Sequence, residues 1–219
     1  MPNSHPQNSD IIVYLAHLDD FNEASLMADE RIPNWVKRQA QTLADKRKIQ
    51  FLACRLLLSH ILRDHYQFDG LPNIEISANG RPQFMDKQAP DFNISHSQSA
   101  IAVAVCRYGR IGLDIEWHRQ RKNIDKVTDN FFSPSESLWL HQQSDQLTAF
   151  WLLWTVRESA LKLYAKGVWQ MRQLTVIPEP LSVSADFAPQ IYTIYRRFDD
   201  IHLSISSNLK IAQVKVIRF

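Results

Sequence analysis

Four ionisable side chains occur at spacings that could build one reaction site. In the segment IGLDIE, residues 111–116, Asp114 and Glu116 alternate with apolar residues. Strand side chains point to alternate faces, so the two carboxylates share one face and the apolar side chains share the other. Further along the chain, Glu158 and Lys162 are four residues apart and therefore lie on one face of a helix. Three carboxylates and a cation suit phosphate chemistry assisted by a hard divalent metal ion.

Two like charges on a half-buried face need a cation or water between them. Mg²⁺ is typically held by a few carboxylates together with a substrate phosphate and water. The pattern therefore predicts that Asp114, Glu116 and Glu158 bind Mg²⁺ or Mn²⁺. Lys162 would then contact a phosphate oxygen of the same ligand. Two simpler interpretations compete with this one: a solvated edge strand, and an ordinary surface ion pair between Glu158 and Lys162.

A serine and a histidine follow a short apolar run in FNISHS, residues 92–97. Ser95 and His96 stand at the end of a predicted strand, where side chains commonly point into a cleft, and both can donate hydrogen bonds to phosphate. A histidine whose polar groups are simply satisfied within the fold is the alternative. A hydrolytic Ser–His pair is a further one, but no Gly-x-Ser-x-Gly turn surrounds Ser95.

Length and composition limit the class of protein. The chain has 219 residues, enough for one large domain or for two small halves around a shared core. With 25 Lys and Arg against 23 Asp and Glu, the net charge of +2 is too mild to indicate nucleic acid as a partner. Cys54 and Cys106 are the only cysteines, which excludes a disulfide framework and a cysteine zinc site.

The expected location is the cytoplasm, with no membrane contact. The opening MPNSHPQNSD lacks the charged-then-apolar layout of a signal peptide, and two cysteines fit a reducing compartment. No apolar run approaches the roughly 20 residues needed to span a bilayer. We expect a monomeric globular protein.

Helices and strands are predicted in mixed order, which indicates the α+β class. Helices are expected over about 35–66 and 147–165, and a third begins at the capping box Ser133-Pro134-Ser135-Glu136. A turn is expected at Asn79-Gly80. Predicted strands cover the apolar or alternating segments at 11–15, 74–77, 92–94, 100–106, 111–116, 191–198, 201–206 and 211–219.

Four segments in order carry a family resemblance. FNISHS, GLDIE, NFFSPSE and WTVRESALKLYAKG together resemble the motif series of the 4′-phosphopantetheinyl transferases of the Sfp/AcpT type. The resemblance covers residues 35–167. NGRP at residues 79–82 resembles a Gly-Lys-Pro turn of the family, with Arg81 in place of lysine. Two other departures are Arg157, where lysine is usual, and Cys54, where glycine is common.

The resemblance implies an enzyme that moves the phosphopantetheine arm of coenzyme A onto a serine of an apo acyl, peptidyl or aryl carrier protein, a holo-carrier-protein synthase. The released product would be adenosine 3′,5′-bisphosphate. The implied fold consists of two similar α/β halves related by a pseudo-twofold axis, with the site at their junction. Residues 1–109 would form the half that contacts the coenzyme A phosphates, and residues 110–219 the half that carries the metal and the catalytic acids.

Residue by residue, the resemblance gives Asp114, Glu116 and Glu158 to the metal. One of the two glutamates, with Glu158 favoured, would take the proton of the carrier serine, and Lys162 would assist the transfer. The positions that correspond to coenzyme A phosphate contacts are Arg38, Arg81, Ser95, His96 and Lys162.

Two other functions remain open at this point. A different Mg²⁺-dependent phosphotransfer enzyme could use the same carboxylates but would ignore coenzyme A. A non-catalytic module could bind coenzyme A or carrier proteins, although the complete set of acids speaks against it. A basic run follows the acidic strand and is a candidate docking surface for an acidic carrier, or else a solvated loop: His118, Arg119, Arg121 and Lys122.

Overall fold

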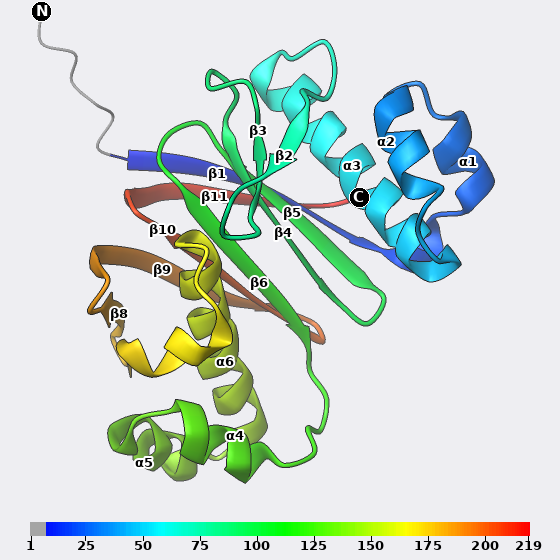
Figure 1. The fold of residues 1–219 in the computed structure, drawn as a ribbon. Helices are drawn as coiled ribbons and strands as arrows, with labels where there is room; N and C mark the ends of the chain where they lie inside the picture. The colour runs from blue at the N-terminus through cyan, green and yellow to red at the C-terminus, as the bar shows by residue number, and fades with distance from the viewer. Residues whose placement is uncertain (1–7) are drawn as a thin grey trace, which may run out of the picture.

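The computed structural model describes residues 8–219, and the predictions made for the first seven residues lie outside this range. The architecture is mixed α and β, which confirms the predicted class (Figure 1). Two sheets meet near the middle of the molecule. Figure 1 shows α1–α3 gathered on one side of the first sheet and α6 along the second, with α4 and α5 beyond the lower end of α6.

The first sheet has four strands in the order β11-β1-β5-β4. Their bounds are β11 Lys210–Arg218, β1 Asn8–His17, β5 Ala100–Cys106 and β4 Asp91–Ser97. β11 pairs parallel with β1, while the other neighbours are antiparallel. The end of the chain thus completes the sheet that its beginning forms. β11 therefore lies in the first sheet, although the prediction assigned residues 110–219 to the other half. The division at residue 110 stays a prediction.

The second sheet has five strands in the order β6-β10-β9-β8-β7. Their bounds are β6 Ile111–Trp117, β10 Ile201–Ser207, β9 Ala188–Phe198, β8 Leu181–Ala185 and β7 Leu174–Pro178. A separate hairpin joins β2 Ile74–Ile76 to β3 Pro82–Phe84 through the predicted Asn79-Gly80 turn. Gly80 has φ +78, a left-handed conformation that glycine adopts without steric cost.

The helices around the first sheet are η1 Leu18–Asp20, α1 Glu23–Ala28, α2 Asn34–Ala40 and α3 Asp45–Tyr66. The single helix predicted over 35–66 was wrong in one respect, because it is interrupted between Ala40 and Asp45. The Thr42 hydroxyl donates to the Gln39 carbonyl at 2.8 Å, and Ala44 is extended with ψ 152. A side-chain bond to the backbone thus ends the first helix where no glycine or proline marks it.

The helices around the second sheet are α4 Ile124–Phe131, α5 Pro134–Gln142, α6 Gln146–Leu163 and η2 Val168–Gln173. The capping box at Ser133 and Glu136 is present, so the predicted start of α5 is confirmed. The prediction missed α1, α4, β3, β7 and β8, and the short 3₁₀ helices η1 and η2. Within residues 8–219, the helices include none long and apolar enough to cross a membrane.

An apolar layer fills the space between the two sheets. β5 contributes Ala100, Ala102 and Ala104, small side chains that let the facing strands come close. β6 contributes its apolar face from the other sheet, with Ile111, Leu113 and Ile115 each at most 1% exposed. This burial explains why IGLDIE tolerates acids on one face only.

The approach of α6 to β6 requires glycine at position 112. A Cβ there would lie 1.9 Å from the Ser159 carbonyl oxygen and 2.5 Å from the Leu163 nitrogen, too close for any other residue. Ser159 also bonds to Ser206 of β10 through their hydroxyls at 2.8 Å. These contacts hold the helix that carries Glu158 and Lys162 directly against the strand that carries Asp114 and Glu116.

Candidate active site

The edge strands of the two sheets, β4 and β6, are joined by side chains instead of by backbone pairing. Alternate β4 side chains accept the N–H groups of alternate β6 residues, at 2.8–3.2 Å. The pairs are Asp91 with Ile111, Asn93 with Leu113, Ser95 with Ile115, and Ser97 with Trp117. We call this set of four bonds the β4–β6 ladder. It satisfies backbone donors that would otherwise be buried without a partner.

The two serines of the ladder also hold the acids of β6. The Ser95 hydroxyl donates to Asp114 Oδ1 at 3.0 Å, and the Ser97 hydroxyl donates to Glu116 Oε2 at 2.5 Å. Ser97 was missed by the sequence analysis. The signal was available, because Ser97 lies two residues after Ser95 on a strand and so shares its face.

α6 brings the remaining predicted groups to the same place. Lys162 Nζ donates to Asp114 Oδ1 at 2.6 Å and to Ser95 Oγ at 2.9 Å. Asp114 is 5% exposed, and burial raises its pKa while Lys162 opposes that rise. The surface ion pair considered between Glu158 and Lys162 is not the one that forms, since Lys162 pairs with Asp114 instead.

Glu158 has a strongly raised pKa. Burial, followed by the charge of Asp114, raises the pKa of Glu158 to about 7, with Lys162 acting in the other direction. Its carboxylate makes no hydrogen bond or ion pair with any residue in the range 8–219. Burial also raises the pKa of Glu116, against the effect of the Ser97 hydrogen bond. Perturbed acids that cluster in this way are typical of a functional site.

The donor set fits a hard divalent cation. Asp114 Oδ2 is buried and has no hydrogen-bond partner, so its lone pairs are available to a metal ion. Asp114, Glu116 and Glu158 would supply carboxylate oxygens, the ligands that Mg²⁺ prefers. In the described part of the chain, no three His, Cys, Asp or Glu side chains already stand at mutual metal-binding distance. The metal assignment therefore stays a prediction.

His96 lies on the other face of β4 from the two serines and is exposed. Its pKa is lowered by desolvation and by the charges of Lys162 and Arg47. Arg47 at the start of α3 is thus a neighbour that the sequence analysis did not select. Arg38, which was predicted as a phosphate contact, is exposed on α2, and within residues 8–219 no hydrogen bond or ion pair links it to the cluster.

The turn that contains Arg81 meets the end of α6. A pocket of about 250 Å³ is lined from one side by the turn at residues 79–82, and from the other by Lys162, Ala165 and Lys166. Arg81 itself is 4% exposed and binds four acceptors inside the protein. The structure therefore brings the predicted turn to the site, but with its guanidinium directed inward.

The basic run after β6 divides into two parts. Arg119 and Lys122 are exposed, although Arg119 lies 4.0 Å from Glu116. The Arg121 guanidinium lies 4.2 Å above the centre of the Trp154 ring. Its positive charge acts to lower the pKa of both Glu116 and Glu158. Arg119 and Arg121 therefore both lie beside the acids, whereas Lys122 faces solvent.

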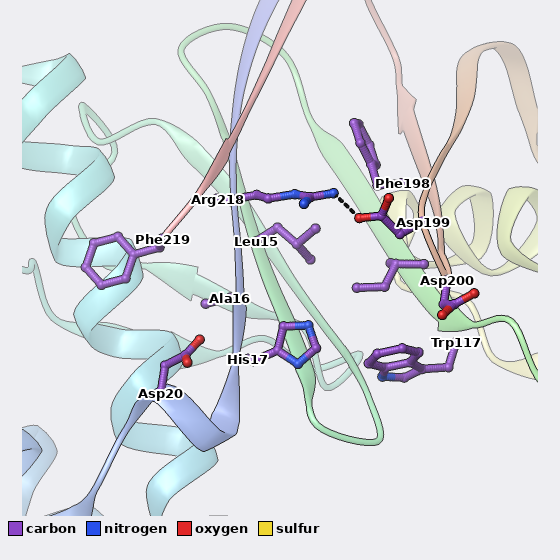
Figure 2. A pocket seen from close by; sticks show the side chains of 11 residues that line it. Leu15, Ala16, His17, Asp20, Trp117, Phe198, Asp199, Asp200, Arg218 and Phe219 are labelled. Carbon is purple, nitrogen blue, oxygen red and sulfur yellow. Dashed lines mark hydrogen bonds and ion pairs between the residues drawn. The ribbon is translucent and has the colours of Figure 1, made fainter.

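A second cavity, of about 380 Å³, lies between the ends of the two sheets (Figure 2). Its walls come from β1, β6, β11 and the β9–β10 turn, and include His17, Trp117 and the Asp199–Arg218 ion pair. Trp117 lies on the apolar face of β6, opposite Glu116. This cavity is therefore separated from the acids by the strand itself.

Comparison with known proteins identifies the family. Residues 110–214 match the family described as "ACPS: 4'-phosphopantetheinyl transferase superfamily". The uncharacterized protein YieE of Escherichia coli K12 is 36% identical over 136 residues, which are 61% of this chain and 55% of YieE. This chain thus matches about half the length of that relative.

Two other relatives are matched over more of their length. The 4'-phosphopantetheinyl transferase AcpT of Salmonella typhimurium is 33% identical over 66% of this chain and 74% of AcpT. The 4'-phosphopantetheinyl transferase gsp of Aneurinibacillus migulanus is 30% identical over 75% of each chain. The chain belongs to the 4′-phosphopantetheinyl transferase superfamily.

Proposed function

We propose that this protein transfers the 4′-phosphopantetheine arm of coenzyme A to a serine hydroxyl of an apo carrier protein. The reaction is Mg²⁺-dependent and releases adenosine 3′,5′-bisphosphate. The observation that carries the proposal is the convergence of Asp114, Glu116, Glu158 and Lys162 where β4, β6 and α6 meet. The names of AcpT and gsp support the reaction class.

The side chains of the site have different roles in the proposed reaction. Within residues 8–219, Glu158 has no hydrogen-bond partner, so its carboxylate is free to take the serine proton as the hydroxyl attacks the β-phosphate. Lys162 offers an ammonium group to the negative charge that develops on the phosphate oxygens. Ser95 and Ser97 hold Asp114 and Glu116 in place. Mg²⁺ bound by Asp114, Glu116 and Glu158 would neutralise charge on the pyrophosphate.

The coenzyme A phosphates would lie between the first sheet and the end of α6. His96, Lys162 and Ser95 are the phosphate contacts of the proposal, and Arg47 is added because its charge reaches His96. The proposal includes the two-half arrangement with a pseudo-twofold axis. It is supported by one long helix against each sheet: α3 beside β5, and α6 beside β6.

Mass spectrometry tests the reaction directly. With coenzyme A and a panel of apo carrier proteins, a phosphopantetheine adduct is expected in Mg²⁺ or Mn²⁺ and is expected to vanish in excess EDTA. Full transfer in EDTA would contradict the metal assignment. Failure with every carrier in Mg²⁺, alongside measurable coenzyme A binding, would favour a non-catalytic binding module.

Carrier docking is tested by reversing the charge of the basic run that faces solvent. We expect Lys122→Glu to raise the apparent KM for an acidic carrier several-fold at low salt, with the KM for coenzyme A nearly unchanged. Arg119 and Arg121 are left intact because both lie beside Glu116. Lys126→Glu on the exposed part of α4 is the matched control. An unchanged carrier KM at low salt would rule out this surface.

A further inference from the structure

The guanidinium of Arg81 binds four acceptors from three separate elements. Nη1 donates to the Lys162 carbonyl at 2.7 Å. Nη2 donates to Asp91 Oδ2 at 2.6 Å, to the Phe92 carbonyl at 2.9 Å and to the Ile111 carbonyl at 2.8 Å. The four acceptors belong to β4, the start of β6 and the last turn of α6. One side chain thus ties together all the elements that build the site.

The position of these bonds links Arg81 to both sets of site residues. Asp91 is the first rung of the β4–β6 ladder, and its Oδ2 also accepts the Ile111 N–H at 2.8 Å. At the other end, Arg81 holds the backbone of the residue whose ammonium pairs with Asp114. The carbonyls in the last turn of a helix have no partner within the helix, so an arginine there fixes where that turn ends.

The turn that carries Arg81 is itself held rigid. The Arg81 N–H donates to the Ser77 hydroxyl at 3.1 Å, and the Ser77 N–H donates to the Arg81 carbonyl at 2.9 Å. A guanidinium has five donors in a planar fork and can serve several acceptors at once, which a lysine ammonium cannot do with the same geometry. Rotating Arg81 outward to a ligand would leave three carbonyls and a carboxylate without this donor.

We infer that Arg81 is a positioning residue, which sets the place of Lys162 relative to β4 and β6, and is not a phosphate contact of coenzyme A. This inference rests on the proposed transferase function and changes one assignment carried over from the family resemblance. On this inference, the basic side chains that bind the coenzyme A phosphates are His96, Lys162 and Arg47, and Arg81 is not among them. It also gives a physical reason for arginine in a turn where lysine would be expected.

Kinetics with coenzyme A and 3′-dephospho-coenzyme A separate the two roles. For Arg81→Lys and Arg81→Gln, we expect kcat to fall at least 10-fold. The KM for coenzyme A should stay within about 2-fold, and the preference for coenzyme A over its 3′-dephospho form should be preserved. A KM that rises 10-fold or more with kcat unchanged, together with a lost preference, would overturn the inference. Arg63→Lys and Arg63→Gln, at an exposed position of α3, are the matched controls.

A labelling experiment gives a readout that needs no turnover. Lysine acetylation, followed by mass spectrometry, should modify Lys162 several-fold faster in the Arg81 variants, because its ammonium is no longer held against Asp114. Exposed Lys87 serves as the internal reference. Where the Arg81 variants fail to fold, Asp91→Asn removes one partner and should increase Lys162 labelling in the same direction. Unchanged Lys162 labelling in the variants that fold would overturn the inference, whereas a wild type without transfer activity would refute only the proposed function.

Discussion

Glu158→Gln is expected to reduce transfer by about 10²–10⁴-fold, the range typical for loss of a general acid–base group, or by more if metal binding is lost as well. The same variant should be at least as stable as the wild type without metal. The reason is the isolation of this carboxylate, which is largely buried beside Asp114 and has no internal hydrogen bond. Glutamine keeps the shape and removes the charge.

The pKa of Glu158 determines how its contribution to stability changes with pH. The pKa of Glu158 is raised to about 7, whereas an unfolded glutamate titrates near 4.3, so ionisation opposes folding. In the wild type, the contribution of Glu158 to the free energy of unfolding is complete below the pKa of the unfolded state. This contribution is lost as the pH rises through about 7. With a discount for the partial exposure of the side chain, the loss is roughly 1–2 kcal/mol, or about 2–8 °C in Tm.

Thermal melts in EDTA between pH 5 and pH 8 measure this effect. The Tm difference between Glu158→Gln and wild type should increase with pH, and Glu30→Gln at an exposed position should show no such trend. A transfer assay in saturating Mg²⁺ is run on the same samples. A large fall in Tm with near-normal turnover would mean that Glu158 is a structural acid.

Breaking the ion pair between Arg157 and Glu136 is expected to cost roughly 3–5 kcal/mol of stability, because the partner is left as a buried charge. Both side chains are 1% exposed. Arg157 binds both carboxylate oxygens of Glu136 and also donates to the carbonyls of Met171 and Leu174. For a chain of this length, such a loss lowers Tm by roughly 6–20 °C.

Denaturant unfolding of Arg157→Met, Glu136→Gln and the double variant forms a mutant cycle. The double variant should lose less than the sum of the single variants, since it removes both charges together. Arg218→Met breaks an exposed ion pair with Asp199 and should cost less than about 1 kcal/mol. If Arg157→Met kept the wild-type Tm and lost turnover, Arg157 would act in the reaction and not in the fold.

The parts of the site that follow from local periodicity could be predicted from the sequence. Alternation in IGLDIE is enough to place Asp114 and Glu116 on one face of β6, because an apolar layer fills the other. Four-residue spacing places Glu158 and Lys162 together. The capping box at Ser133 and Glu136 is local as well, so the start of α5 was predicted correctly.

The parts that depend on packing between distant segments could not be predicted in this way. Glu136 serves the cap and also neutralises Arg157, 21 residues further along the chain, which no local pattern indicates. The inward direction of Arg81 depends on where the last turn of α6 ends. The pairing of β11 with β1 joins residues about 200 positions apart, so an alternating segment predicts the strand but not its sheet.

The β4–β6 ladder also bears on how this protein avoids self-association. A strand at the edge of a sheet normally offers unpaired N–H and C=O groups to any passing strand, and proteins guard such edges with charges, prolines or bulges. Here the first sheet protects the edge of β6, because Asp91, Asn93, Ser95 and Ser97 of β4 occupy four β6 N–H groups. Separating the sheets would expose these four N–H groups to other chains. The contacts that hold Asp114 and Glu116 through Ser95 and Ser97 therefore also keep the edge of β6 from pairing with another chain.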